Sequence, residues 1–258
     1  MRTLATVMML ALGASAASAE VRTKVVEYSQ GGTALEGFLA WDGAVKGPRP
    51  GVLVVHEWTG LGKYVKSRAE QLAKLGYVAF CADIYGKGVR PATPEEAAKT
   101  AAIYKQDRAL TRARVNAALA QLKADPLVDP KRVAAIGYCF GGMVALELAR
   151  GGAEIAGVVA FHGDLSNPTP ADDANIRCKV LALQGGDDPF VTLKDVELFE
   201  ERMRAAHVNW EVNEYGGAVH AFTNPDAGND NAKGSAYNAQ ADRRSWQAMR
   251  DFFAEIFK

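Results

Sequence analysis

Short apolar runs recur along the chain and alternate with longer segments in which apolar residues follow helical spacing. Short runs bounded by glycine or polar residues indicate strands, whereas apolar positions three and four residues apart indicate amphipathic helices. The expected strands are residues 21–28, 35–41, 51–56, 77–81, 132–136, 155–161, 180–184 and 208–214. The expected helices are residues 66–75, 94 to about 122 with or without a break, 141–149, 193–205 and 245–257.

The order of these segments predicts the fold class. Repeated alternation of strand and helix is typical of an α/β protein with a mainly parallel central sheet and helices on both faces. The chain has 258 residues and shows no internal repeat. Sheets of this class often exceed 200 residues without dividing, so we expect one domain over residues 20–258.

The first residues have the pattern of a secretory signal peptide. Arg2 supplies a positive charge, Leu4–Leu12 is a short apolar segment, and Ala17-Ser18-Ala19 fits a cleavage site. A buried helix and a membrane span are the alternatives, but the apolar segment is too short to cross about 30 Å of hydrocarbon. Residues 1–19 are therefore predicted to be removed, and the product is predicted to be exported to the periplasm or secreted, without a membrane span.

Charge and cysteine content exclude several classes of function. Lys plus Arg and Asp plus Glu both number 30, so no basic excess favours nucleic-acid binding. The three cysteines are Cys81, Cys139 and Cys178, an odd number that leaves at least one thiol unpaired. The sequence has no CxxC motif and no Cys/His cluster with zinc spacing, so we expect neither a metal nor a cofactor.

The motif with the clearest chemistry lies between an expected strand and an expected helix. Gly137-Tyr138-Cys139-Phe140-Gly141 matches the glycine–x–nucleophile–x–glycine elbow, with cysteine as the nucleophile. Side chains at the two glycine positions would collide with the neighbouring strand and helix. The sulfur of Cys139 would lie beside the positive end of the next helix, which favours a thiolate. The alternative is a small buried cysteine before a glycine-rich turn.

Two later residues complete a nucleophile–acid–base order. Asp188 and His220 both follow expected strands, where loops leave the carboxyl edge of the sheet. His220 is the best candidate base, and Asp188 would orient its ring and stabilise the imidazolium. Alternatively, Asp187 or Asp188 caps a loop and His220 is structural. Weaker cases belong to His56, which could line the site, to His162 as a structural residue, and to His207 as a surface residue.

Glu57 and Trp58 follow the expected strand that ends at His56. In an elbow of this kind, one oxyanion donor comes from this loop and another from the residue after the nucleophile. These positions predict the backbone N–H groups of Trp58 and Phe140 as the donors. A carboxylate of Glu57 near a thiol would raise both pKa values, although a loop acid without a catalytic role is an equal alternative.

Together these segments resemble the dienelactone hydrolase family of the α/β-hydrolase superfamily, over nearly the whole mature chain. The resemblance implies the α/β-hydrolase fold and a triad of Cys139, Asp188 and His220. It also implies that Glu57 pairs with the resting thiol and takes its proton when substrate arrives. The residues that carry the resemblance are His56–Gly60, Gly76–Gly86, Gly137–Gly142, Asp187–Val191 and His220–Phe222.

One departure concerns the substrate. Members that cleave dienelactone hold its carboxylate with arginines, one of them shortly after the catalytic histidine. Here Asn224 stands four residues after His220, and the next arginine is Arg243. An amide does not replace a bidentate arginine.

The sequence therefore predicts a hydrolase that cleaves a carboxylic ester or lactone through an acyl-thioester intermediate, with the substrate under the loops 86–94 and 220–240. A thioesterase or another acyl hydrolase, a redox thiol protein using Cys81 or Cys178 with Cys139, and a non-catalytic binding module are the alternatives. The expected partner is a small-molecule substrate, and the expected state is a monomer or weak homo-oligomer.

Overall fold

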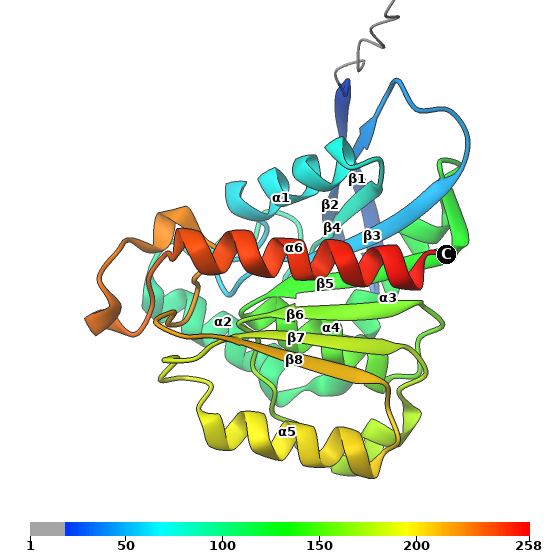
Figure 1. Ribbon diagram of the computed structural model, residues 1–258. Helices are drawn as coiled ribbons and strands as arrows, with labels where there is room; N and C mark the ends of the chain where they lie inside the picture. The colour runs from blue at the N-terminus through cyan, green and yellow to red at the C-terminus, as the bar shows by residue number, and fades with distance from the viewer. Residues whose placement is uncertain (1–18) are drawn as a thin grey trace, which may run out of the picture.

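The computed structural model of the protein describes residues 19–258 (Figure 1). The predicted signal peptide, residues 1–19, lies outside the described residues except for Ala19. No helix in residues 19–258 is long and apolar enough to cross a membrane.

Eight strands form one sheet with the order β1-β2-β4-β3-β5-β6-β7-β8. The hairpin β1–β2 is antiparallel and joins β4 in antiparallel fashion, whereas all other neighbours are parallel. This topology confirms the predicted mainly parallel sheet. The strands are β1 Val21–Gln30, β2 Thr33–Asp42, β3 Arg49–Val55, β4 Val78–Ala82, β5 Val128–Tyr138, β6 Gly157–Phe161, β7 Lys179–Gly185 and β8 Trp210–Tyr215.

Helices cover both faces of the sheet, as predicted. In Figure 1, α6 passes in front of the strands and α4 lies behind them. Helix α1 packs on β2 and β4, and α6 on β6 and β7, whereas α3 and α4 pack on the opposite face. The helices are α1 Lys63–Lys74, α2 Pro94–Gln106, α3 Arg108–Ala124, α4 Phe140–Arg150, α5 Leu193–Ala205 and α6 Ala239–Ile256, with short 3₁₀ helices at Pro170–Asn175 (η1), Pro225–Ala227 (η2) and Asn231–Lys233 (η3).

Polar caps explain two helix boundaries that the sequence pattern left open or placed elsewhere. The segment from residue 94 divides at Asp107, whose carboxylate accepts a hydrogen bond from the Leu110 N–H at 2.8 Å and so starts α3. Helix α6 begins at Ala239 rather than at residue 245, because the side chain of Asn238 caps the N–H groups of Gln240 and Ala241.

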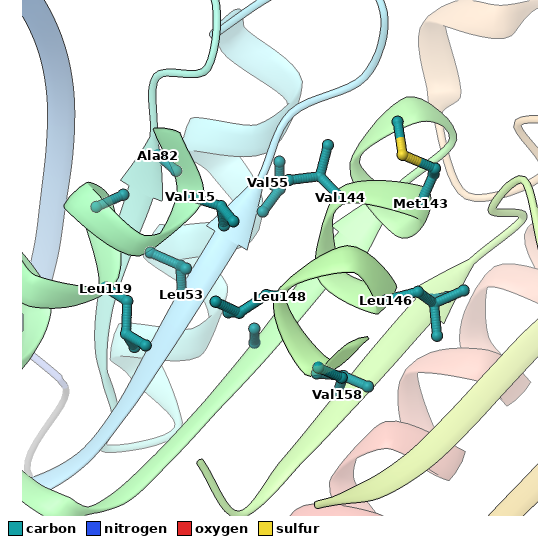
Figure 2. Packing of buried hydrophobic residues seen from close by; sticks show 14 of the residues in the cluster. Leu53, Val55, Ala82, Val115, Leu119, Met143, Val144, Leu146, Leu148 and Val158 are labelled. Atoms are coloured by element: carbon teal, nitrogen blue, oxygen red, sulfur yellow. The ribbon is translucent and has the colours of Figure 1, made fainter. Parts of the chain in front are cut away.

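The core follows the two-residue period of the strands. On β3, Leu53 and Val55 face α3 and α4, whereas Val52 and Val54 face α1 and α6. All four side chains are fully buried. Figure 2 shows the first of these faces, where residues of three elements meet: Leu53, Val55, Val115, Leu119, Val144 and Leu148.

The parallel strands place their carboxyl ends at one edge of the sheet. Glu57 follows β3, Cys139 follows β5, Asp188 follows β7 and His220 follows β8. Residues that are widely separated in the sequence therefore share one edge.

Candidate active site

Cys139 occupies a strained turn between β5 and α4. Its backbone has φ 54° and ψ −116°, in a region that L-residues rarely adopt. A Cβ on Gly137 would lie 1.8 Å from the carbonyl oxygen of Gly141, and a Cβ on Gly141 would lie 2.4 Å from that of Val55. The predicted collisions with helix and strand are thus confirmed, and both glycines are needed for the bend.

The thiol, the imidazole and one carboxylate converge at this turn. His220 Nε2 lies 3.0 Å from Cys139 Sγ, and His220 Nδ1 lies 2.8 Å from Asp188 Oδ2. The other oxygen of Asp188 accepts hydrogen bonds from the N–H groups of Phe190 and Val191. Asp187 is exposed, so the structure resolves the choice between the two aspartates: Asp188 is the partner of His220.

The surroundings of His220 favour its protonated form. Burial opposes the charge on the ring, but the charge of Cys139 and the hydrogen bonds to Asp188 and Cys139 outweigh burial and raise the pKa of His220 to about 10. Since Asp188 accepts from Nδ1, the second proton lies on Nε2, which faces the sulfur. This arrangement suits an imidazolium beside a thiolate.

Glu57 has a different partner from the one that the resemblance implied. Its Oε2 accepts a hydrogen bond of 2.7 Å from Asn224 Nδ2, whereas the Cys139 thiol contacts His220. Burial raises the pKa of Glu57 to about 7, although the Asn224 hydrogen bond opposes the shift. Burial thus favours the protonated form of the Glu57 carboxyl group more than water does.

His56 does not line the site, contrary to one of the expectations. It is fully buried, with Nδ1 2.6 Å from the carbonyl oxygen of Glu57 and Nε2 3.3 Å from the N–H of Ile84. Its ring stacks on Phe140 at 5.9 Å. His56 thus has a structural place between β3 and β4, while His207 is exposed as expected.

The two proposed oxyanion donors lie on different segments. Phe140 is the first residue of α4, so its N–H has no acceptor within the helix. Trp58 follows Glu57, and its carbonyl oxygen accepts a hydrogen bond of 2.9 Å from the Tyr85 hydroxyl. That bond fixes the peptide after Trp58 relative to the end of β4.

A buried polar cluster supports the His220 segment from behind. The Thr223 hydroxyl lies 2.6 Å from Tyr64 Oη and 2.7 Å from His162 Nε2, and the Thr223 carbonyl accepts 2.6 Å from Arg68 Nη2. The His162 ring stands edge-on to His220 at 5.2 Å. Sequence reasoning missed Thr223, Tyr64 and Arg68, because only the packing of α1 against the loop after β8 brings them together.

A cavity of about 460 Å³ adjoins Glu57. Residues 57–65 form one part of its wall, and residues of the 221–235 segment form the other. Residues of the 220–240 loop thus take part in the wall, whereas the 86–94 loop does not. The 86–94 loop packs behind the wall, where Arg90 Nε donates to the carbonyl oxygen of Leu61 at 2.9 Å. Glu57 and Trp58 line the cavity, but the triad residues Cys139, Asp188 and His220 do not.

Within residues 19–258, no cluster of three or more histidine, cysteine or acidic side chains could hold a metal ion. All three cysteines are free thiols, and Cys81 and Cys178 are buried. Burial raises the pKa of Cys178 to about 12 and also raises that of Cys81.

The sequence model of the dienelactone hydrolase family matches residues 35–257. The chain belongs to the dienelactone hydrolase family. A solved structure of a dienelactone hydrolase-like promiscuous phosphotriesterase from metagenomic libraries is 41% identical, with a TM-score of 0.88 over 93% of this chain and 100% of the other. The predicted family, the α/β-hydrolase fold and the class of dienelactone hydrolase-like carboxylic ester hydrolase are thereby confirmed.

Curated relatives are more distant. A protein of Methylorubrum extorquens that is named for carboxymethylenebutenolidase activity is 27% identical over 219 residues, which cover 81% of this chain and 73% of the relative. A Bradyrhizobium protein that is named for 2-oxo-3-(5-oxofuran-2-ylidene)propanoate lactonase activity is 30% identical over 187 residues, 69% of this chain and 75% of the relative. This chain is similar to both along most of the domain.

Proposed function

We propose that this dienelactone hydrolase-family protein cleaves small carboxylic esters or lactones with Cys139 as nucleophile, His220 as general acid and base, and Asp188 as the group that orients His220. The contact of 3.0 Å between His220 Nε2 and Cys139 Sγ carries the proposal. Such a distance allows direct proton transfer between a nucleophile and its base.

Acylation begins from the thiolate–imidazolium pair. The Cys139 sulfur attacks the carbonyl carbon, a C–S bond forms, and the N–H groups of Phe140 and Trp58 hold the oxyanion. When the intermediate collapses, the C–O bond to the leaving alcohol breaks. The leaving oxygen takes the proton from His220 Nε2, so His220 becomes neutral.

Deacylation uses the same histidine as a base. Neutral His220 removes a proton from water, and the resulting hydroxide attacks the thioester carbon. The C–S bond breaks, the carboxylic acid leaves, and the thiolate is restored beside the imidazolium. Asp188 stays ionised throughout and stabilises the charged ring.

The cavity wall suits an uncharged substrate. Among residues 19–258, its charged members are the acids Glu57 and Asp226 and one lysine, Lys63, and none is an arginine. The polar residue Asn224 lies in the wall, but it is an amide and already donates a hydrogen bond to Glu57. Within the described part of the chain, the wall therefore offers no side chain that could bind a substrate carboxylate through two parallel hydrogen bonds. We infer a preference for neutral esters or lactones.

Thioesters and other acyl compounds share the same chemistry and form an alternative substrate class. A redox role has less support, since Cys81 and Cys178 are buried and their thiols resist ionisation.

We also propose that residues 1–19 direct export and are removed, since they have the pattern of a signal peptide.

Phosphotriesters are a second candidate substrate class. The observation that favours them is the 41% identity with the metagenomic phosphotriesterase over 93% of this chain. Turnover of paraoxon by the wild type, and its absence in Cys139→Ala, would support this activity, whereas no turnover by the wild type would exclude it.

Turnover of p-nitrophenyl acetate tests the main proposal. Cys139→Ala and His220→Ala should each lower kcat/KM at least a thousandfold. The matched control Cys178→Ala alters a buried thiol outside the triad and should keep the wild-type kcat/KM. Acyl transfer to Cys139 would appear by mass spectrometry as a covalent adduct. Full activity in Cys139→Ala would refute the nucleophile.

A further inference from the structure

A second cavity of about 270 Å³ shares no wall residue with the cavity beside Glu57. It is bounded by the corner between α2 and α3, by residues 165–168 after β6, and by α5. Neither Cys139, Asp188 nor His220 lines it. Three cations do: Lys105, Arg108 and Arg202.

The cations of this wall outnumber its acids. Asp195 is the one acidic residue in the wall among the described residues. Its carboxylate is already held in the capping box of α5, where Oδ2 accepts from the Thr192 N–H at 2.8 Å and from the Thr192 hydroxyl at 2.6 Å. Lys105 has a partner in Asp164 at 3.3 Å, just beside the cavity. The wall as a whole keeps positive charge.

Arg108 is the least satisfied of these cations. Its side chain is only 13% exposed, and its Nε and Nη1 are buried without a hydrogen-bond acceptor among residues 19–258. Glu147 lies 3.8 Å away, but its two oxygens already accept from Arg150 at 3.1 Å and Arg112 at 2.8 Å. Burial lowers the pKa of Arg108, although the charge of Glu147 opposes the shift.

A second unpaired donor lies in the same wall. The side-chain amide of Asn167, a residue that is 5% exposed, has its Nδ2 buried without an acceptor among the described residues. Buried donors are nearly always paired in folded proteins, and leaving one unpaired destabilises the fold, most of all for a charged group. Both residues with such donors, Arg108 and Asn167, belong to the wall of this cationic cavity.

We propose that this cavity binds a small organic carboxylate, with its charged end toward Arg108, Lys105 and Arg202 and its apolar end on α5. Arginine favours a planar carboxylate, which accepts two parallel hydrogen bonds. The rest of the wall is largely apolar and includes Leu165, Leu198 and Phe199. Acids of this class are also what an ester hydrolase releases.

Calorimetric titration with hexanoate tests the proposal. The wild type should bind one equivalent, and the affinity should fall with added salt because of screening. The variant Lys105→Gln/Arg202→Gln should bind at least tenfold more weakly, while the control Lys99→Gln/Arg204→Gln should bind as the wild type does. The control removes the same two charges from the same two helices, α2 and α5, and both of its side chains are exposed outside the cavity wall.

Further arms separate this cavity from the active site. Enzyme carboxymethylated at Cys139 should keep hexanoate binding, and Lys105→Gln/Arg202→Gln should keep wild-type kcat/KM toward p-nitrophenyl acetate. Absence of binding in the wild type, equal binding by the double variant, or loss of binding on carboxymethylation would overturn the proposal. Inorganic phosphate binding as tightly as hexanoate would overturn the choice of an apolar carboxylate.

Discussion

Replacing Thr223 with valine removes the hydroxyl on which two buried side chains meet. Tyr64 Oη and His162 Nε2 lie 2.6 and 2.7 Å from the Thr223 oxygen, and Thr223 itself is fully buried. Valine has nearly the same shape, so the change deletes hydrogen bonds without opening a large cavity. Tyr64 Oη and His162 Nε2 would each lose the hydrogen bond to the Thr223 hydroxyl.

The expected loss of stability follows from these two contacts. An unpaired buried polar group costs about 1–3 kcal/mol, and this cost applies to His162, which is fully buried. Tyr64 adds less, because its hydroxyl still accepts from Arg68 Nε at 3.3 Å and its side chain borders the cavity beside Glu57. The variant should therefore lose a large fraction of a typical stability of about 5–15 kcal/mol. Activity should also fall, because His162 supports the ring of His220 at 5.2 Å. A misplacement of about 1 Å can cost about a hundredfold in rate.

Urea unfolding and ester hydrolysis, measured where each variant is folded, check this prediction. Thr223→Ser keeps the hydroxyl and should retain most of the stability and activity. Thr223→Val should show a lower kcat with little change in KM, since Thr223 does not line the cavity beside Glu57. Equal stability and kcat in the valine and serine variants would show that the hydroxyl does not position His220.

Four other predictions follow from the site. Gly137→Ala should destabilise the fold by on the order of 3 kcal/mol, measured by urea unfolding, because its Cβ would lie 1.8 Å from the Gly141 oxygen. NMR should show that His220 stays protonated up to about pH 10. The raised pKa of His220 also stabilises the folded state: this contribution is complete below pH 6.5 and is lost as the pH rises through 10. The pH profile of kcat/KM should show an inflection near pH 7 that Glu57→Gln removes. The folded state raises the pKa of Glu57 from 4.5, so the free energy of unfolding of the wild type should fall as the pH rises from 4.5 to 7. The Glu57→Gln variant should lack this fall. Finally, p-nitrophenyl butyrate should be cleaved with a higher kcat/KM than the p-nitrophenyl monoester of succinate, and the opposite order would contradict the neutral-substrate inference.

Much of the fold could be predicted from local patterns. The apolar runs at residues 51–56 and 180–184 became β3 and β7, because a strand buried on both faces needs an unbroken apolar segment. The nucleophile elbow could also be predicted, because side chains at Gly137 and Gly141 would collide with the backbone that surrounds the Cys139 turn. The helix boundaries at Asp107 and Asn238 were not predicted, because competing polar residues could have supplied either cap.

The amino-acid sequence by itself determined the order of strands and helices, the strained turn at Cys139 and the candidates for its acid and base. Only the tertiary structure decided that Glu57 bonds Asn224 and that Arg108 is left beside a cationic cavity. The physical reason is distance along the chain. Local sterics and hydrophobic period act between near neighbours, whereas hydrogen bonds such as that between Glu57 and Asn224 join residues that only the packed sheet edge brings together.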